Sequence, residues 1–115
     1  MAIAFGSIVV EIAKLRDYCL SRSHPRGRHK ARFFRARLGL TEGDAELLRR
    51  SLVDAVNLHA SDLHATDADA YGQRYALEFT MTTAVGSARI RSRWIVRTGE
   101  DVLRFVTCYI VRGRS

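Results

Sequence analysis

The chain has 115 residues, of which 47% are hydrophobic and 27% charged, so its composition is that of one folded domain over 1–115 and excludes a disordered chain. Its net charge is +7, and one proline and 8 glycines leave no room for a long flexible linker. The two cysteines are far apart in the sequence and do not resemble a secreted disulfide framework, so we expect buried free thiols.

The first apolar run precedes Glu11 and carries no basic residue ahead of it. It is far shorter than the ~20 residues that span a bilayer, so neither a signal peptide nor a membrane partner is expected and the predicted location is cytoplasmic. Helical spacing follows, with apolar side chains at Ile12, Leu15, Cys19 and Leu20. This spacing predicts a helix over 10–20, which ends before Pro25.

A second helix is predicted from about Gly27 to Leu38, with Gly39 as its stop signal. Its buried face is expected to carry Ala31, Phe34 and Leu38, and another face carries Arg28, Arg32 and Arg35. A third helix is predicted to start at Thr41–Asp44 and to end near His59.

The polar stretch 59–72 predicts no element of its own. Apolar and polar residues then alternate over 75–82, 90–96 and 103–111, which predicts three strands joined by short turns. On the last strand, Leu103, Phe105, Thr107, Tyr109 and Val111 are expected on one face. Because the helices precede the strands, we expect an α+β domain in which about three N-terminal helices pack on a three- to four-stranded antiparallel β-meander.

Charge is divided into blocks along the chain: +7 over 22–37, −5 over 42–78 and +5 over 89–114. The first block contains HPRGRHKARFF (24–34), which has no acid and opens a helix whose free N–H groups attract anions. In the last block Arg89, Arg91 and Arg93 share one strand face, because side chains alternate. Either the two basic blocks bind a phosphate-bearing partner, or acids such as Glu78 neutralise them.

The phosphate-binding hypothesis assigns nucleic-acid contacts to five arginines: Arg26, Arg28, Arg32, Arg89 and Arg91. Phe33 and Phe34 favour core packing over stacking on bases. His24 and His29 lie among cations that favour the neutral imidazole, which suits a general base. A zinc site built from Cys19, His24, His29 and Cys108 lacks any known ligand spacing, so we expect neither a metal nor a cofactor.

Four segments carry a resemblance to a known family: HPRGRHKARFF, LGLTEGDAELLRRSLVDA, ATDADAYGQRYALEF and RSRWIVRTGEDVLRFVTCYIV. From about Lys14 onward the chain resembles DUF6883, a family of small bacterial proteins of unknown function. The family implies no activity. A more distant resemblance, of architecture and residue type, is to toxin ribonucleases of the barnase-like, RelE-like and colicin-like kinds. It implies metal-free catalysis by residues corresponding to His24, Lys30, Arg93, Thr107 and Tyr109.

Together these observations predict a metal-independent, toxin-like endoribonuclease acting on RNA phosphodiesters. His24 or His29 would remove the 2′-hydroxyl proton, and Lys30 and Arg93 would stabilise the charge on the phosphorane. Tyr109 or Thr107 would position the phosphate. The alternatives are a non-catalytic binding module of a two-protein operon and an inactive relative of a nuclease. The implied partners are RNA and a small cognate, antitoxin-like protein.

Overall fold

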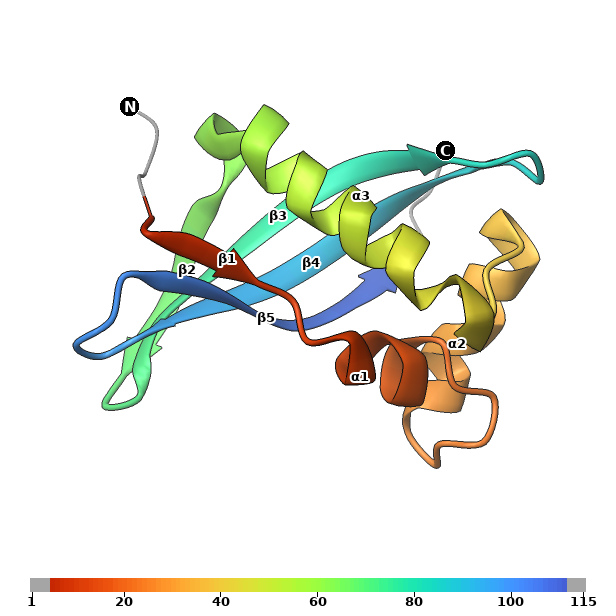
Figure 1. The fold of residues 1–115 in the computed structure, drawn as a ribbon, viewed down its shortest axis with the longest axis horizontal. Helices are drawn as coiled ribbons and strands as arrows, with labels where there is room; N and C mark the ends of the chain where they lie inside the picture. Colours follow the sequence, from red (N-terminus) through yellow and green to blue (C-terminus); the bar gives the residue numbers. More distant parts are fainter. Residues whose placement is uncertain (1–4, 112–115) are drawn as a thin grey trace.

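A computed structural model describes residues 5–111, which form an α+β fold with the helices ahead of most of the sheet (Figure 1). Its helices are α1 (Ile12–Lys14), α2 (Gly27–Leu38) and α3 (Ala45–Leu58), with a π-helix (Leu15–Cys19) and 3-10 turns at Glu42–Asp44 and Ala60–Asp62. Its strands are β1 (Ser7–Val9), β2 (His64–Asp69), β3 (Gly72–Thr82), β4 (Ser87–Arg97) and β5 (Val102–Ile110).

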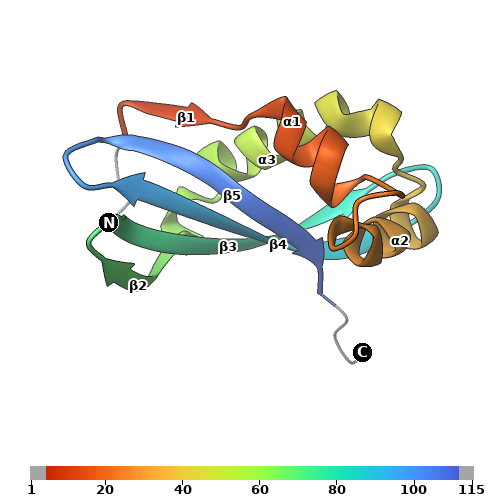
Figure 2. The same cartoon turned by 90° about the horizontal axis from the view of Figure 1, so that it is seen from below.

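The sheet has five strands in the order β1-β5-β4-β3-β2, so the expectation of a three- to four-stranded meander is partly wrong. The predicted strands 75–82, 90–96 and 103–111 are β3, β4 and β5, which are antiparallel. β1 adds a parallel edge beside β5, and β2 adds the opposite edge. Figure 2 shows α3 over one face of the sheet and α2 beside the end where β5 stops.

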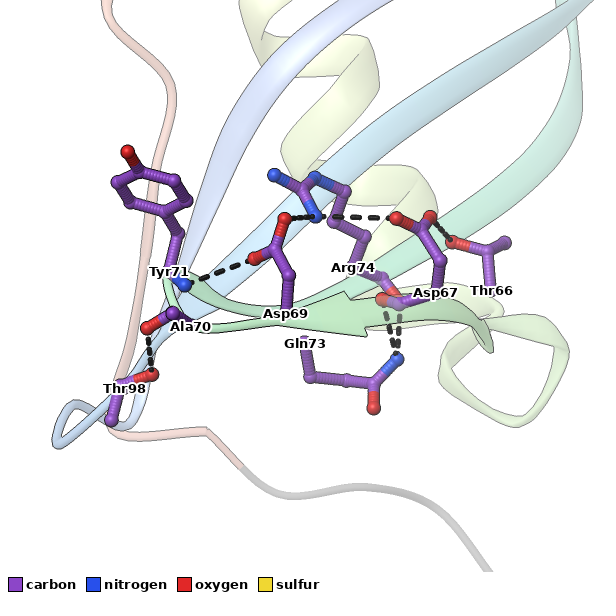
Figure 3. Close-up of polar contacts among 8 residues, drawn as sticks. All are labelled: Thr66, Asp67, Asp69, Ala70, Tyr71, Gln73, Arg74 and Thr98. Carbon is purple, nitrogen blue, oxygen red and sulfur yellow. Dashed lines mark hydrogen bonds and ion pairs between the residues drawn. The ribbon is translucent and has the colours of Figure 1, made fainter.

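The stretch 59–72, for which no element was predicted, contains β2 and the turn into β3 (Figure 3). All residues of β2 are exposed on both sides, which explains why its sequence lacks apolar alternation. Polar contacts hold this hairpin: Arg74 Nη1 bonds Asp69 at 2.9 Å and Asp67 at 3.2 Å. The backbone N–H of Tyr71 donates a further hydrogen bond to Asp69 at 2.9 Å. Arg74 therefore neutralises part of the negative charge of the acidic block 42–78 within the hairpin.

The first predicted helix is not a single α-helix. Val10 precedes α1, and from Leu15 the chain winds as a π-helix in which the Leu20 N–H donates to the Leu15 carbonyl five residues earlier, at 2.8 Å. The wider turn buries Leu15, Cys19 and Leu20 together. Single π-turns occur frequently at functional sites, and this one supplies two side chains to the site below.

The second helix, α2, matches its prediction. It buries Ala31, Phe34 and Leu38 and ends at Gly39, whose φ of 71° is the left-handed conformation typical of a helix stop. Its first residue, Gly27, lies against the π-helix so closely that a Cβ would overlap the Tyr18 carbonyl oxygen. A glycine is therefore required where the two helices meet.

The predicted start of the third helix is also confirmed. Thr41 and Asp44 form a reciprocal capping box around the 3-10 turn that leads into α3. Within residues 5–111, no helix combines the length and apolar character needed to cross a bilayer.

Candidate nucleic-acid interface

A β-bulge in β5 determines which side chains reach the candidate site. Opposite β4, Arg93 pairs with Thr107 but Trp94 pairs with Phe105, so Val106 is an extra residue on β5. A bulge of this kind reverses the faces of the residues that follow it, and bulges often lie next to functional sites for that reason.

The prediction of which β5 side chains share a face is therefore wrong for the residues after Phe105. Before the bulge Phe105 faces the core, and after it Cys108 and Ile110 do. Thr107 and Tyr109 lie instead on the opposite face of the sheet, where their β4 partners are Arg93 and Arg91. Simple alternation could not reveal this change, because one inserted residue shifts the period for the rest of the strand.

Lys30 of α2 reaches this face at the edge of β5. Its Nζ donates to Thr107 Oγ1 at 3.0 Å and lies 4.8 Å from the ring centroid of Tyr18 and 5.7 Å from that of Tyr109. The faces of the two tyrosine rings attract the cation, and the Thr107 hydroxyl orients one of the three N–H bonds of the ammonium. The ammonium is thereby held in one place between the π-helix and β5.

A cavity of about 420 Å³ opens beside Lys30. Its lining consists of His29, Lys30, Phe33, Tyr109 and Ile110, so α2 forms one wall and the end of β5 the other. We call it the α2–β5 pocket. Two aromatic rings, an imidazole and a fixed ammonium therefore face the same space.

A second hollow follows the neighbouring face of α2. It measures about 380 Å³ and is lined by Arg22, Arg28, His29, Arg32 and Arg35, and we call it the basic groove. Within residues 5–111, none of its arginines is ion-paired with a carboxylate, and Glu42 accepts only the backbone N–H of Arg22, at 3.2 Å. The groove thus keeps its positive charge, and His29 borders both the groove and the pocket.

His24 has a different role from His29. Its Nδ1 accepts the backbone N–H groups of Arg26 and Gly27, each at 3.0 Å, at the start of α2. Its ring packs edge-on against Tyr18 with centroids 4.7 Å apart. Because the Nδ1 lone pair serves as a helix cap, the nitrogen available to a ligand is limited to Nε2.

The three arginines of the row on β4, Arg89, Arg91 and Arg93, differ in their ion pairs. Glu78 on β3 accepts a hydrogen bond from Arg91 at 3.2 Å and forms an ion pair with Arg89 at 3.6 Å, so these two of the predicted nucleic-acid contacts share one carboxylate that offsets part of their charge. Arg93, next to Thr107, makes no ion pair within the part of the chain that the structure describes. Of the helical arginines, Arg28 and Arg32 line the groove and Arg26 is exposed beside it.

Beneath Lys30 lie both cysteines, which are buried and free as expected. Cys19 Sγ is 3.7 Å from Thr107 Oγ1. A hydrogen bond with Cys108, supported by Thr107 and the charge of Lys30, lowers the pKa of Cys19 to about 6 although burial opposes the shift. Burial raises the pKa of Cys108. Within residues 5–111, no group of three or more His, Cys, Asp or Glu side chains is arranged to hold a metal ion.

The structure therefore brings together Lys30, Thr107 and Tyr109, with His29 in the same pocket and Arg93 on the adjacent strand. The predicted site residues did not include Tyr18 or Arg22, and Arg35 was placed only on the arginine face of α2. The spacing of Arg28, Arg32 and Arg35 along α2 indicated the groove's helical side, but no local signal indicated that Arg22 would join it.

The chain thus has an α+β fold with a basic, aromatic-lined cleft between a helix and the edge of its sheet. The chain belongs to the family described as Domain of unknown function (DUF6883), which matches residues 4–112. No curated protein and no solved structure matches the chain. The distant resemblance to toxin ribonucleases is not supported by these comparisons.

Proposed function

We propose that the protein binds RNA through the basic groove of α2. The observation that carries the proposal is the groove's lining of four arginines and a histidine, with no carboxylate paired to those arginines within residues 5–111. Unpaired cations at a concave surface attract phosphates, and the counterions released by each contact drive binding. Arginine also suits phosphate because its planar fork can donate two parallel hydrogen bonds.

The acidic residues of the chain are distributed consistently with this role. Six arginines outside the groove are paired with Asp or Glu: Arg16, Arg49, Arg74, Arg89, Arg91 and Arg104. Of the nine arginines that make no ion pair within residues 5–111, six lie in α2 or shortly before it: Arg22, Arg26, Arg28, Arg32, Arg35 and Arg37.

The test is the salt dependence of binding to a labelled single-stranded RNA, measured by fluorescence anisotropy. For single strands, each phosphate contact contributes about −0.7 to the slope of log K against log salt, so several contacts give a slope on the order of −3. The double substitution Arg28→Ala and Arg32→Ala is expected to remove about two contacts from that slope. Arg49→Ala is the matched control, because Arg49 is already held by Glu46 at 2.6 Å.

A flat salt dependence in the unmodified protein would contradict RNA binding. It would leave an acidic protein, such as a small antitoxin-like partner, as the ligand of the groove.

Cleavage of the bound RNA is a second candidate function, favoured by the position of His29 between the groove and the fixed Lys30. His29 would take the 2′-hydroxyl proton while the 2′-oxygen attacks the adjacent phosphorus and the 5′-oxygen leaves with a proton from water or Tyr109. The products are a cyclic phosphate and a 5′-hydroxyl. Lys30 and Arg93 would stabilise the phosphorane, and Thr107 would keep Lys30 in position.

Mass spectrometry of incubated RNA tests this second function. Cyclic-phosphate ends should appear with the unmodified protein in the presence of EDTA and disappear with His29→Ala. The exposed His59 at the end of α3 supplies the control, since His59→Ala should leave the products unchanged. Intact RNA across a wide pH range would leave binding alone as the function.

A further inference from the structure

The α2–β5 pocket differs in chemistry from the groove beside it. The groove presents guanidinium groups, whereas the pocket presents the rings of Phe33 and Tyr109, the imidazole of His29 and the ammonium of Lys30. Phosphates alone do not account for an aromatic cavity of about 420 Å³. The pocket needs a ligand with a flat, largely apolar body and polar edges.

The helix aligns the two surfaces. Arg28 and Arg32 are four residues apart on α2, as are His29 and Phe33, so each pair lies on successive turns. The two rows run side by side along the same two turns, because neighbouring residues of a helix differ by about 100° in direction. A strand whose phosphates follow the arginines therefore passes directly beside the pocket.

Lys30 adds a directional element to the pocket. Thr107 receives one of its N–H bonds at 3.0 Å, and the rings of Tyr18 and Tyr109 flank the ammonium. A lysine held in this way presents its remaining donors in fixed directions, which suits the carbonyl oxygens and ring nitrogens at the edge of a nucleobase.

We propose that the α2–β5 pocket accepts one unstacked base of a single-stranded RNA, with Phe33 and Tyr109 as the stacking surfaces and Lys30 at the edge of the base. This rests on the proposed function, because the phosphates beside that base are those that the basic groove binds. Bases inside a duplex stay stacked on their neighbours and do not enter such a pocket, whereas single strands are recognised by stacking on aromatic side chains. The substrate class is therefore single-stranded RNA rather than duplex RNA.

The experiment compares three probes of one sequence by fluorescence anisotropy at one salt concentration: a single-stranded 12-mer, the same strand annealed to its complement, and the same strand carrying abasic residues. We expect the single strand to bind about tenfold more tightly than either of the other two. Phe33→Leu and Tyr109→Leu should each weaken single-strand binding by about fivefold or more and leave duplex binding unchanged.

Two further variants keep the test valid. Tyr109→Phe retains the ring and should recover most of the single-strand affinity that Tyr109→Leu loses, which separates loss of stacking from loss of folding. Val85→Ala alters an exposed apolar side chain in the β3–β4 turn and should change nothing. Melting temperatures of all variants establish that they are folded.

Equal affinity for the single-stranded, duplex and abasic probes, with a steep salt dependence, would overturn the base pocket and leave the groove as a phosphate-binding surface. Failure of all three probes to bind would overturn the proposed function and the base pocket together.

Discussion

Lys30 Nζ donates a hydrogen bond of 3.0 Å to Thr107 Oγ1, which connects the middle of the basic segment to a strand 77 residues later in the chain. The contact exists only because the bulge at Val106 turns Thr107 away from the core. Two features that are separate in the sequence, a cationic helix and a strand irregularity, thus form one site.

Replacing the hydroxyl of Thr107 should release Lys30. Thr107→Val keeps the size of the side chain and removes the acceptor, so we expect RNA affinity to fall several-fold with a stability loss of roughly 1 kcal/mol, since the contact is partly solvated. Thr107→Ser should restore both values. Anisotropy and urea unfolding measure them, and unchanged affinity in the valine variant would show that Lys30 does not depend on this bond.

The pKa of Cys19 should make stability depend on pH. The folded state holds the thiolate above pH 6, whereas the unfolded thiol stays protonated up to its ordinary pKa of 9.0. Between these values the unfolded state binds more protons, so the free energy of unfolding rises with pH by up to about 1.4 kcal/mol per pH unit. This contribution of Cys19 to stability is lost as pH falls through 6.

Urea unfolding between pH 6.5 and 8.5 tests this pH dependence, with Cys19→Ser as the comparison. The serine variant should lack the rise, because serine does not titrate in this range. Parallel curves for the two proteins would show that Cys19 is protonated in the folded state.

Removing the charge of Glu78 should strengthen RNA binding, if the proposed function holds. Glu78→Gln frees Arg89 and Arg91 from the carboxylate that pairs with them, on the sheet face that carries Thr107 and Tyr109. We expect several-fold tighter binding at low salt and a difference that shrinks at high salt. Glu100→Gln, which frees only Arg104 at the other end of β5, should have no such effect. Unchanged binding in both variants would separate the β4 arginines from the interface.

Trp94 should be among the most costly residues to truncate. It is 1% exposed, stacks edge-on against Phe105 at 5.5 Å, and donates from Nε1 to Ser92 Oγ at 2.8 Å. Trp94→Ala is expected to cost about 3–5 kcal/mol of unfolding free energy. Tyr71→Ala, at a site that is 76% exposed, should stay within about 0.5 kcal/mol. A loss below about 1 kcal/mol for Trp94→Ala would contradict the packing seen in the structure.

Several features followed from the sequence by itself because they depend on neighbours along the chain. Gly39 ends α2 in the left-handed conformation, Thr41 and Asp44 cap the third helix, and Trp94 lies in the core of an alternating strand. Local backbone geometry and the period of apolar residues determine these features. Both signals are contained in a short stretch of sequence, no longer than a few helical turns or one strand.

Other features were decided only by tertiary structure. The edge strand β2 is exposed on both faces, so hydrogen bonds to β3 define it and no hydrophobic pattern indicates it. The bulge at Val106 depends on how β5 registers with β4, and the π-helix ending at Cys19 depends on burying Leu15, Cys19 and Leu20 together. The bulge and the π-helix together place Tyr18, Thr107 and Tyr109 around Lys30. Pairing between segments that are distant in the sequence sets this arrangement, and no local preference of the chain specifies it.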